Sequence, residues 1–165
     1  MKKLLIRLFF ALLALLALAG LVVGVEFFGG QPLGLFSGSR PDTLGFSVGK
    51  FAPPSWKPNS VSSTVDKSDE KHYIAPISYA GPGAEAWRRL VVIVKSNPRV
   101  TVVRESAAYL HIEYKSAGMG YIDDVEFALD EKAGVIHVRS ASRLGIRDMD
   151  VNRKRIESIR AQFGN

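Results

Sequence analysis

The sequence predicts an α+β domain in which about five antiparallel strands form one sheet and two helices pack on one face of it. Four runs of alternating apolar and polar residues follow one another between residues 100 and 142, and this alternation is typical of strands with one buried face. Two segments with apolar residues at helical spacing flank the four runs, and an uncharged segment precedes the domain. The expected order is β-α-β-β-β-β-α, preceded by one N-terminal transmembrane or signal helix.

The N-terminal segment has the features of a membrane-targeting helix. Lys2, Lys3 and Arg7 precede the uncharged run Leu8–Val25. As a helix this run would extend about 27 Å, whereas the hydrocarbon core of a bilayer is about 30 Å thick. Because positive charge stays in the cytoplasm, the residues after Glu26 are expected on the outer side.

Two fates of this segment are open. It is either an uncleaved signal anchor or a signal peptide cleaved after Ala17-Leu18-Ala19, which has the A-x-A pattern of a cleavage site. The anchor is favoured, because the apolar run continues past that site to Val25. The predicted location is therefore the inner (cytoplasmic) membrane, as a single-pass protein with its N-terminus in the cytoplasm and its domain on the periplasmic or equivalent outer side. Secretion to the periplasm is the alternative.

Composition divides the chain into three regions. Residues 1–28 form the signal anchor or signal peptide, residues 29–57 a linker and extended lead-in rich in Gly, Pro and Ser, and residues 58–165 the α+β domain. Prolines exclude long regular structure from the lead-in. We expect its aromatic residues Phe46, Phe51 and Trp56 to attach it to the domain.

Charge and cysteine content exclude several classes of function. The chain has no cysteine, which excludes a disulfide framework, a thiolate metal site and a cysteine nucleophile. Its net charge is +6, but Pro58 is followed by 16 basic and 14 acidic residues, a balance of only +2. Nucleic acid is therefore not an expected partner. The stretch from Arg139 onward is more basic and could meet an anionic ligand, a lipid head group or an envelope protein. No cofactor is expected.

The elements of the domain follow from its patterns. A strand is expected around His72–Tyr79. After Gly81-Pro82-Gly83 a helix begins, and Asn97-Pro98 ends it. The four strands that follow are expected at Val100–Arg104, Ala108–Lys115, Tyr121–Leu129 and Val135–Ser142, joined by short turns that suit antiparallel neighbours. The last helix should run from about Asp150 to Phe163, with Asp148 or Asp150 as its N-cap.

Strand alternation also predicts a polar face of the sheet. Directly opposed residues of an antiparallel pair lie on one face, so if Phe127 pairs with Ile136 or Val138, Glu126 must pair with His137 or Arg139. The simplest interpretation is a solvated face with cross-strand ion pairs. The functional interpretations are a metal site of His111, Glu113 and Glu126 or Asp124, or a general acid–base pair of a carboxylate and a histidine.

A second candidate site is the stretch from Arg139 to Arg155. A strand end, a glycine loop and a helix N-terminus come together there, and helix N-termini and arginine forks both bind anions. Alternatively the charges are neutralised internally, with the arginines paired to Asp123 and Asp124 and with Asn152 as a satisfied buried amide. The candidate binding residues of both regions are His111, Glu113, Asp123, Asp124, Glu126, Arg139, Ser140, Ser142, Arg143, Asn152 and Arg155.

Three segments resemble a known family. They are Lys57-Pro58-Asn59-Ser60-Val61-Ser62-Ser63, Tyr121-Ile122-Asp123-Asp124-Val125-Glu126-Phe127 and Arg139-Ser140-Ala141-Ser142-Arg143-Leu144-Gly145, followed by Asp148, Asn152-Arg153 and Arg155-Ile156-Glu157. In this order they resemble the family catalogued as domain of unknown function 1499, from about Gly45 to Phe163.

The resemblance implies an exported or membrane-associated domain and no established activity. It also implies that eight candidate residues are family-pattern positions: Asp123, Asp124, Glu126, Arg139, Ser140, Ser142, Arg143 and Asn152. Relatives often carry cysteines where this chain has Pro54 and Ser60, so a thiol-based role does not extend to this member.

Two functions of different classes follow. The leading hypothesis is a non-enzymatic, envelope-facing accessory or binding domain, tethered to the membrane through its N-terminal helix. It would hold a partner or small anion on the polar strand face or the arginine loop. The alternative is a metal-dependent or acid–base hydrolase-like enzyme, which would need His111, Glu113 and Glu126 to converge in a concave pocket.

Overall fold

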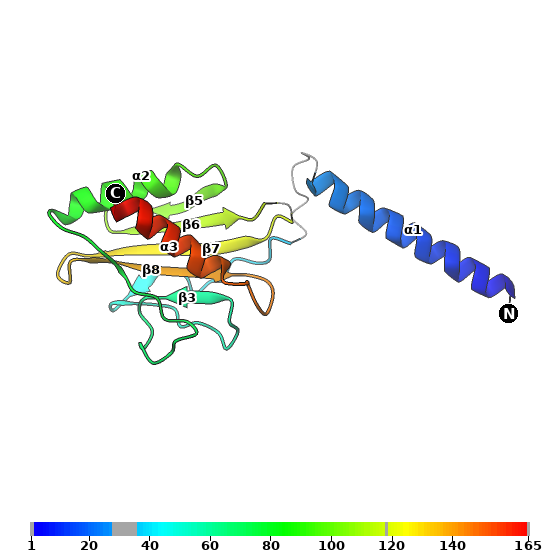
Figure 1. Cartoon of the computed structure of the whole chain (residues 1–165), viewed down its shortest axis with the longest axis horizontal. Helices are drawn as coiled ribbons and strands as arrows, with labels where there is room; N and C mark the ends of the chain where they lie inside the picture. Colours follow the sequence, from blue (N-terminus) through cyan, green and yellow to red (C-terminus); the bar gives the residue numbers. More distant parts are fainter. Residues whose placement is uncertain (1, 28–35, 118, 165) are drawn as a thin grey trace.

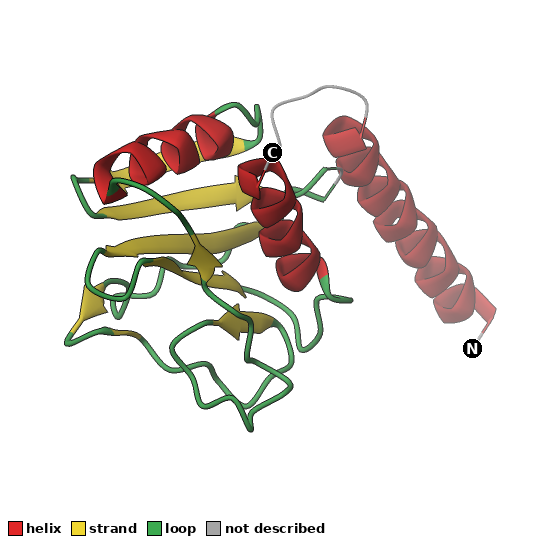
Figure 2. Cartoon of the chain, turned by 60° about the vertical axis from the view of Figure 1, so that its left-hand side comes forward, coloured by secondary structure: helices red, strands yellow, loops and turns green. Residues whose placement is uncertain are grey.

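A computed structural model describes residues 2–27, 36–117 and 119–164. Residues 29–35 of the predicted linker lie outside the described residues. A six-stranded sheet carries helices α2 (Gly83–Lys95) and α3 (Val151–Gly164) on the same face, and both views of the chain show this arrangement (Figure 1, Figure 2). The predicted α+β class and the placement of both helices on one face are confirmed.

Four long strands form an antiparallel meander. They are β5 (Val100–Glu105), β6 (Tyr109–Lys115), β7 (Ile122–Asp130) and β8 (Val135–Ser142). Two short strands, β3 (Ser60–Ser62) and β4 (Ile77–Ser78), pair with the free edge of β8. A separate two-stranded hairpin, β1 (Phe46–Ser47) and β2 (Lys50–Phe51), lies in the lead-in.

The predicted first strand was wrong in extent, and one strand of the sheet was missed. Only Ile77–Ser78 of the segment His72–Tyr79 forms a strand, since Pro76 has no N–H to donate to a ladder. Strand β3 was missed because three residues are too few to show alternation.

The register of the meander agrees with the prediction. Phe127 pairs with Val138, and Glu126 therefore pairs with Arg139. The neighbouring β6–β7 ladder places Asp124 opposite Glu113 on β6. Side chains of adjacent residues consequently alternate between the helix face of the sheet and the opposite face.

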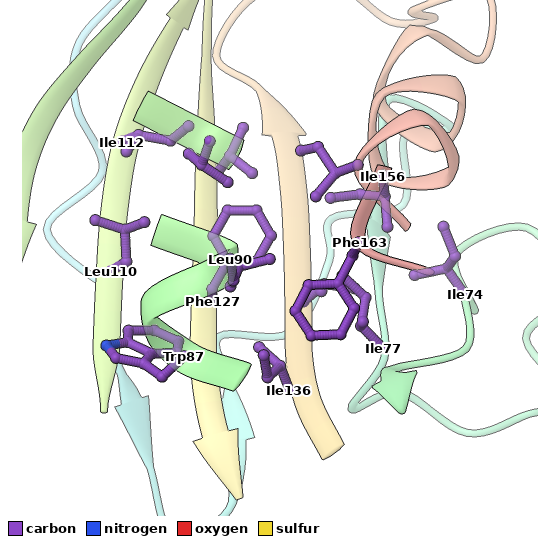
Figure 3. Close-up of a cluster of buried hydrophobic side chains, with 14 of the residues drawn as sticks. Ile74, Ile77, Trp87, Leu90, Leu110, Ile112, Phe127, Ile136, Ile156 and Phe163 are labelled. Atoms are coloured by element: carbon purple, nitrogen blue, oxygen red, sulfur yellow. The ribbon is translucent and has the colours of Figure 1, made fainter. Parts of the chain in front are cut away.

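The hydrophobic core lies between the sheet and the two helices. Leu90 of α2 and Ile156 of α3 are fully buried against Phe127 and Val138 of the sheet. Figure 3 shows the apolar side chains of both helices directed toward the strands. Burying a side chain of this size contributes about 1.5–3 kcal/mol, so the core fixes the strand register on which the polar clusters depend.

Helix α1 spans Lys2–Phe27. Large apolar side chains along it, among them Leu4, Leu12 and Leu21, are exposed. Within the described ranges, however, no helix combines the length and apolarity required to cross a membrane. The predicted transmembrane span is therefore not supported.

The lead-in packs on the face of the sheet that carries no helix. Phe46 packs on Phe51 and stacks on the His137 ring, with ring centroids 5.6 Å apart in the second contact. Nearer the start of the lead-in, the Phe36 ring contacts the Tyr121 ring. The expected roles of Phe46 and Phe51 are thus confirmed, whereas that of Trp56 was wrong, because Trp56 is 72% exposed.

Candidate functional site

The polar face of the sheet is buried beneath the lead-in. His111, Asp124 and Glu126 are 4%, 1% and 0% exposed. The expectation of a solvated face was therefore wrong. No periodic pattern in the sequence predicts this cover, because isolated aromatic and polar contacts hold the lead-in on the sheet.

Eight polar side chains form what we call the lead-in cluster. Its members come from four segments of the chain. They are Arg40 of the lead-in, Tyr109, His111 and Glu113 of β6, Asp124 and Glu126 of β7, Arg139 of β8, and Arg143, which directly follows β8. Strand pairing brings them together, because all the strand members point away from the helices. The three carboxylates are matched by three arginines.

Arg143 is the centre of one half of the lead-in cluster. Its guanidinium donates from Nε and Nη2 to the two Asp124 oxygens, both at 2.8 Å, and from Nη2 to Glu113 at 2.5 Å. His111 Nε2 lies 2.9 Å from the Asp124 carboxylate. On the solvent side, Arg40 also donates to Glu113. This geometry is the two-pronged arginine–carboxylate pairing that combines strength with orientation.

The arginines control the ionisation of these carboxylates. Burial alone would raise the pKa of Asp124, but hydrogen bonds from Arg143 and His111 outweigh it and hold that pKa below its ordinary value. The pKa of Glu113 is lowered in the same way, since Arg143 and Arg40 outweigh its burial. In turn, the hydrogen bonds to Asp124 raise the pKa of Arg143 above its ordinary value.

Glu126 is the centre of the other half. It accepts hydrogen bonds from Arg139 Nη1 at 2.8 Å, from the Tyr109 hydroxyl at 2.7 Å and from the Gly45 backbone N–H at 2.7 Å. Burial, together with the Glu126 carboxylate, raises the pKa of Tyr109 well above its ordinary value. The phenol therefore stays protonated and acts as a donor, and the Gly45 contact ties the lead-in to the sheet.

These pairings do not support the proposed metal site. His111, Glu113 and Glu126 each face a different partner, and the described part of the chain contains no group of three or more His, Asp or Glu side chains suited to a metal ion. The convergent pocket that the enzyme hypothesis requires does not form around these three residues.

A second polar group, the Asn152 cluster, lies on the helix face of the sheet. Asn152 at the start of α3 is fully buried, and its Oδ1 accepts from Ser140 Oγ at 2.5 Å and from Arg155 at 2.6 Å. Its Nδ2 donates to Ser142 Oγ at 2.9 Å and to the Asn59 carbonyl at 3.0 Å. The amide thus joins helix α3 to strands β3 and β8.

Charge in the Asn152 cluster is neutralised locally. Arg155 donates to Asp123 at 2.5 Å and lies over the Tyr114 ring, 4.4 Å from its centroid. Asp148 lies three residues before α3 begins at Val151 and accepts from the Asn152 backbone N–H at 3.0 Å, so its side chain satisfies a free N–H in the first turn of the helix. The expected pairing of arginines with Asp123 and Asp124 and the satisfied amide of Asn152 are confirmed.

The predicted binding residues therefore divide into two clusters on opposite faces of the sheet. The sequence analysis missed three residues that complete the clusters: Arg40, Tyr109 and Asn59. It also missed Lys57 and Ser60, which line a polar pocket beside the lead-in cluster. Tyr109 could have been found, because it shares the polar strand face with His111 and Glu113. Arg40 could not, since only the tertiary path of the lead-in brings it there.

A polar pocket opens at the edge of the lead-in cluster. It encloses about 300 Å³ between the lead-in and strands β3 and β8. Three cations line it (Lys57, Arg139 and Arg143), and Asp124 is the one carboxylate in its lining. Ser39, Thr43, Ser55 and Asn59 add further polar side chains. This volume is at the lower end for ligand pockets in proteins.

Ser60 borders this pocket and has an unsatisfied hydroxyl. The residue is 6% exposed, and its Oγ has no hydrogen-bond partner among the described residues. A buried hydroxyl in this state costs about 1–3 kcal/mol.

The comparisons with known proteins agree with the resemblance read from the sequence. The family model described as protein of unknown function (DUF1499) matches residues 50–163. No curated protein and no solved structure matches the chain.

Proposed function

The chain belongs to the DUF1499 family, whose description assigns no activity, and we propose that it is a non-enzymatic binding domain that holds a small oxyanion, such as phosphate or a carboxylate, in the polar pocket. The observation that carries the proposal is the buried, unpaired hydroxyl of Ser60 beside that pocket. A hydroxyl donor and a surplus of cations are the groups that bind an oxyanion.

The charges around the pocket favour a single small anion. Arg143 is held by Asp124 and Glu113, and Arg139 by Glu126. Lys57 lines the pocket outside these ion pairs. The site therefore offers the charge of one ammonium group together with neutral donors, which suits a monoanion.

Exchange of Ser60 tests the proposal directly. Ser60→Cys keeps the size of the side chain but supplies only a weak donor. We expect titration calorimetry with inorganic phosphate and with acetate to give about tenfold or greater weakening for the preferred anion, as for loss of a hydrogen bond to a charged group. Ser62→Cys is the matched control, because Ser62 is a buried serine of the same strand β3 but does not line this pocket.

Two lysines give a second matched comparison. Lys57→Met should weaken binding, whereas Lys50→Met, in the same lead-in but outside the pocket lining, should leave it unchanged. Unaltered affinity in Ser60→Cys and Lys57→Met together would disprove the site.

We also propose that the domain works on the outer side of the cytoplasmic membrane. The basic N-terminal residues, the uncharged run after them and the exposed apolar side chains of α1 support this location. Protease added to spheroplasts should then digest the domain, and the intact mass of membrane-extracted protein should match the uncleaved chain. A domain protected in intact spheroplasts would place it in the cytoplasm.

A further inference from the structure

A second pocket, larger than the polar pocket, lies on the opposite face of the sheet from the proposed anion site. It encloses about 620 Å³ beside helices α2 and α3 and strands β5 and β6, and both helices cover this face (Figure 1, Figure 2). This size falls within the range of pockets that hold small organic ligands.

The floor and walls of this inter-helix pocket are largely apolar. Ile93 and Val94 come from α2, Val100 and Ile112 from the sheet, and Ile159 from α3. Val94 and Ile112 also belong to the hydrophobic core. A ligand that fills the pocket must therefore bring a substantial apolar part.

The charged residues of the pocket are all cationic. Arg99, Lys154 and Arg155 line it, and its lining contains no carboxylate. Arg155 is paired with Asp123, whereas Lys154 is exposed and reaches only the Met149 carbonyl, at 3.4 Å. Arg99 donates to the Tyr114 hydroxyl at 3.2 Å. The free charge is thus supplied by Arg99 and Lys154.

A polar atom of the pocket also lacks a partner. Ser116 lines it, and the buried Oγ of this residue has no hydrogen bond within the described ranges. An apolar cavity with two cations and an unpaired hydroxyl suits a molecule with a hydrocarbon chain and one anionic end.

We propose that the inter-helix pocket binds a long-chain carboxylic acid, with its alkyl chain between α2 and α3 and its carboxylate beside Lys154 and Arg99. This function is independent of the oxyanion site, since the sheet separates the two pockets. A long-chain alcohol lacks the charge that the two cations select, and it should bind less tightly.

Photoaffinity labelling of the full chain tests this site. A dodecanoic acid carrying a diazirine on its chain should label peptides that contain Ile93–Val100 or Val151–Gln162. Octanoate, decanoate and dodecanoate should compete with increasing strength. Each buried methylene should tighten binding about fourfold, so each two-carbon step should gain about 15-fold.

A pair of tryptophan substitutions distinguishes binding of the probe in this pocket from binding to the exposed apolar side chains of α1. Ser158 is exposed and lines the pocket, whereas Ala161, also exposed on α3, does not. Ser158→Trp should abolish labelling of these peptides, and Ala161→Trp should preserve it. Labelling confined to α1, or equal labelling in both variants, would overturn the proposal.

A second pair tests the anionic end. Lys154→Met should weaken competition by dodecanoate about two- to fivefold, as for an exposed ion pair, and should leave competition by dodecanol unchanged. Lys132→Met in the β7–β8 turn is the control and should have no effect. If dodecanol competed as well as dodecanoate in the unmodified chain, selection of the carboxylate would be refuted.

Discussion

At the scale of single residues, this protein buries charge in matched sets. Asp124 and Glu126 are almost fully buried, yet each faces an arginine at 2.8 Å. Removing one member of such a pair leaves an uncompensated charge away from water, which is far more destabilising than the pair itself is stabilising. The lead-in cluster therefore makes the domain sensitive to single substitutions.

Two arginines on the same carboxylate provide a direct comparison. Arg143→Leu removes the arginine partner of the buried Asp124, which keeps His111, and one of the two arginine partners of Glu113. We expect it to lower the free energy of unfolding by about 3–5 kcal/mol. Arg40→Leu removes a half-exposed partner of Glu113 and should change it by no more than about 1 kcal/mol. Urea unfolding measures both values, and equal effects would show that the cluster is solvated.

Acid should destabilise the domain through Asp124. Its pKa is lowered from 3.8 in the folded state, so its contribution to stability is complete above pH 3.8 and is lost as the pH falls through the lower folded value. Asp124→Asn should reduce stability at neutral pH and flatten the decline below pH 3.8. Urea unfolding between pH 2 and pH 7 checks this. If the free energy of unfolding of Asp124→Asn fell equally steeply below pH 3.8, other carboxylates would be responsible for the acid destabilisation.

Alternation of residues limited the strand partner of Glu126 to His137 or Arg139, and the structure pairs it with Arg139. Paired charges near α3 predicted the internal pairing of Asp123. The burial of these groups could not be predicted in this way. It depends on Phe46, Gly45 and Arg40, which have no periodic relation to the strands that they cover.

At the scale of elements, the lead-in determines what the polar face can do. Gly38 is one point of close contact, with a φ of 64° and a built Cβ that would lie 2.9 Å from Arg143 Cβ. Gly49 also has a positive φ, 75°, but a Cβ there would meet nothing within 4 Å. Alanine at Gly49 would therefore introduce backbone strain alone, whereas alanine at Gly38 would introduce both backbone strain and a steric clash.

We therefore expect unequal effects of alanine at these positions. Gly49→Ala should lower the free energy of unfolding of the domain by about 1–2 kcal/mol, because of its left-handed backbone alone. Gly38→Ala should cost about a further 1–3 kcal/mol from the clash, and it should speed proteolysis within residues 36–57. Urea unfolding and limited proteolysis measure the two effects. Equal stability and equal cleavage would mean that the lead-in is not packed as described.

Helices and long strands were predicted closely because their apolar patterns extend over many residues. The predicted strand Val135–Ser142 agrees with β8 at both ends. Short elements were missed. Strand β3 is defined by a partner distant in sequence, and the strands of the β1–β2 hairpin have two residues each, too few to show alternation.

At the scale of the whole molecule, one sheet separates two pockets of different chemistry. The polar pocket lies beneath the lead-in, and the inter-helix pocket lies on the side of the core. The linings of the two pockets share no residue, so a substitution can be placed in one without changing the lining of the other. This arrangement suits a binding domain, and the charge pairing of His111, Glu113 and Glu126 gives it no free catalytic group among those three.

Native mass spectrometry of the full chain tests the oxyanion site most directly. We predict that with excess phosphate or acetate the unmodified protein carries one small anion that is lost on denaturation, and that Ser60→Cys and Lys57→Met carry less of it than Ser62→Cys and Lys50→Met. A bare chain under these conditions, or equal retention in all four variants, would contradict the account.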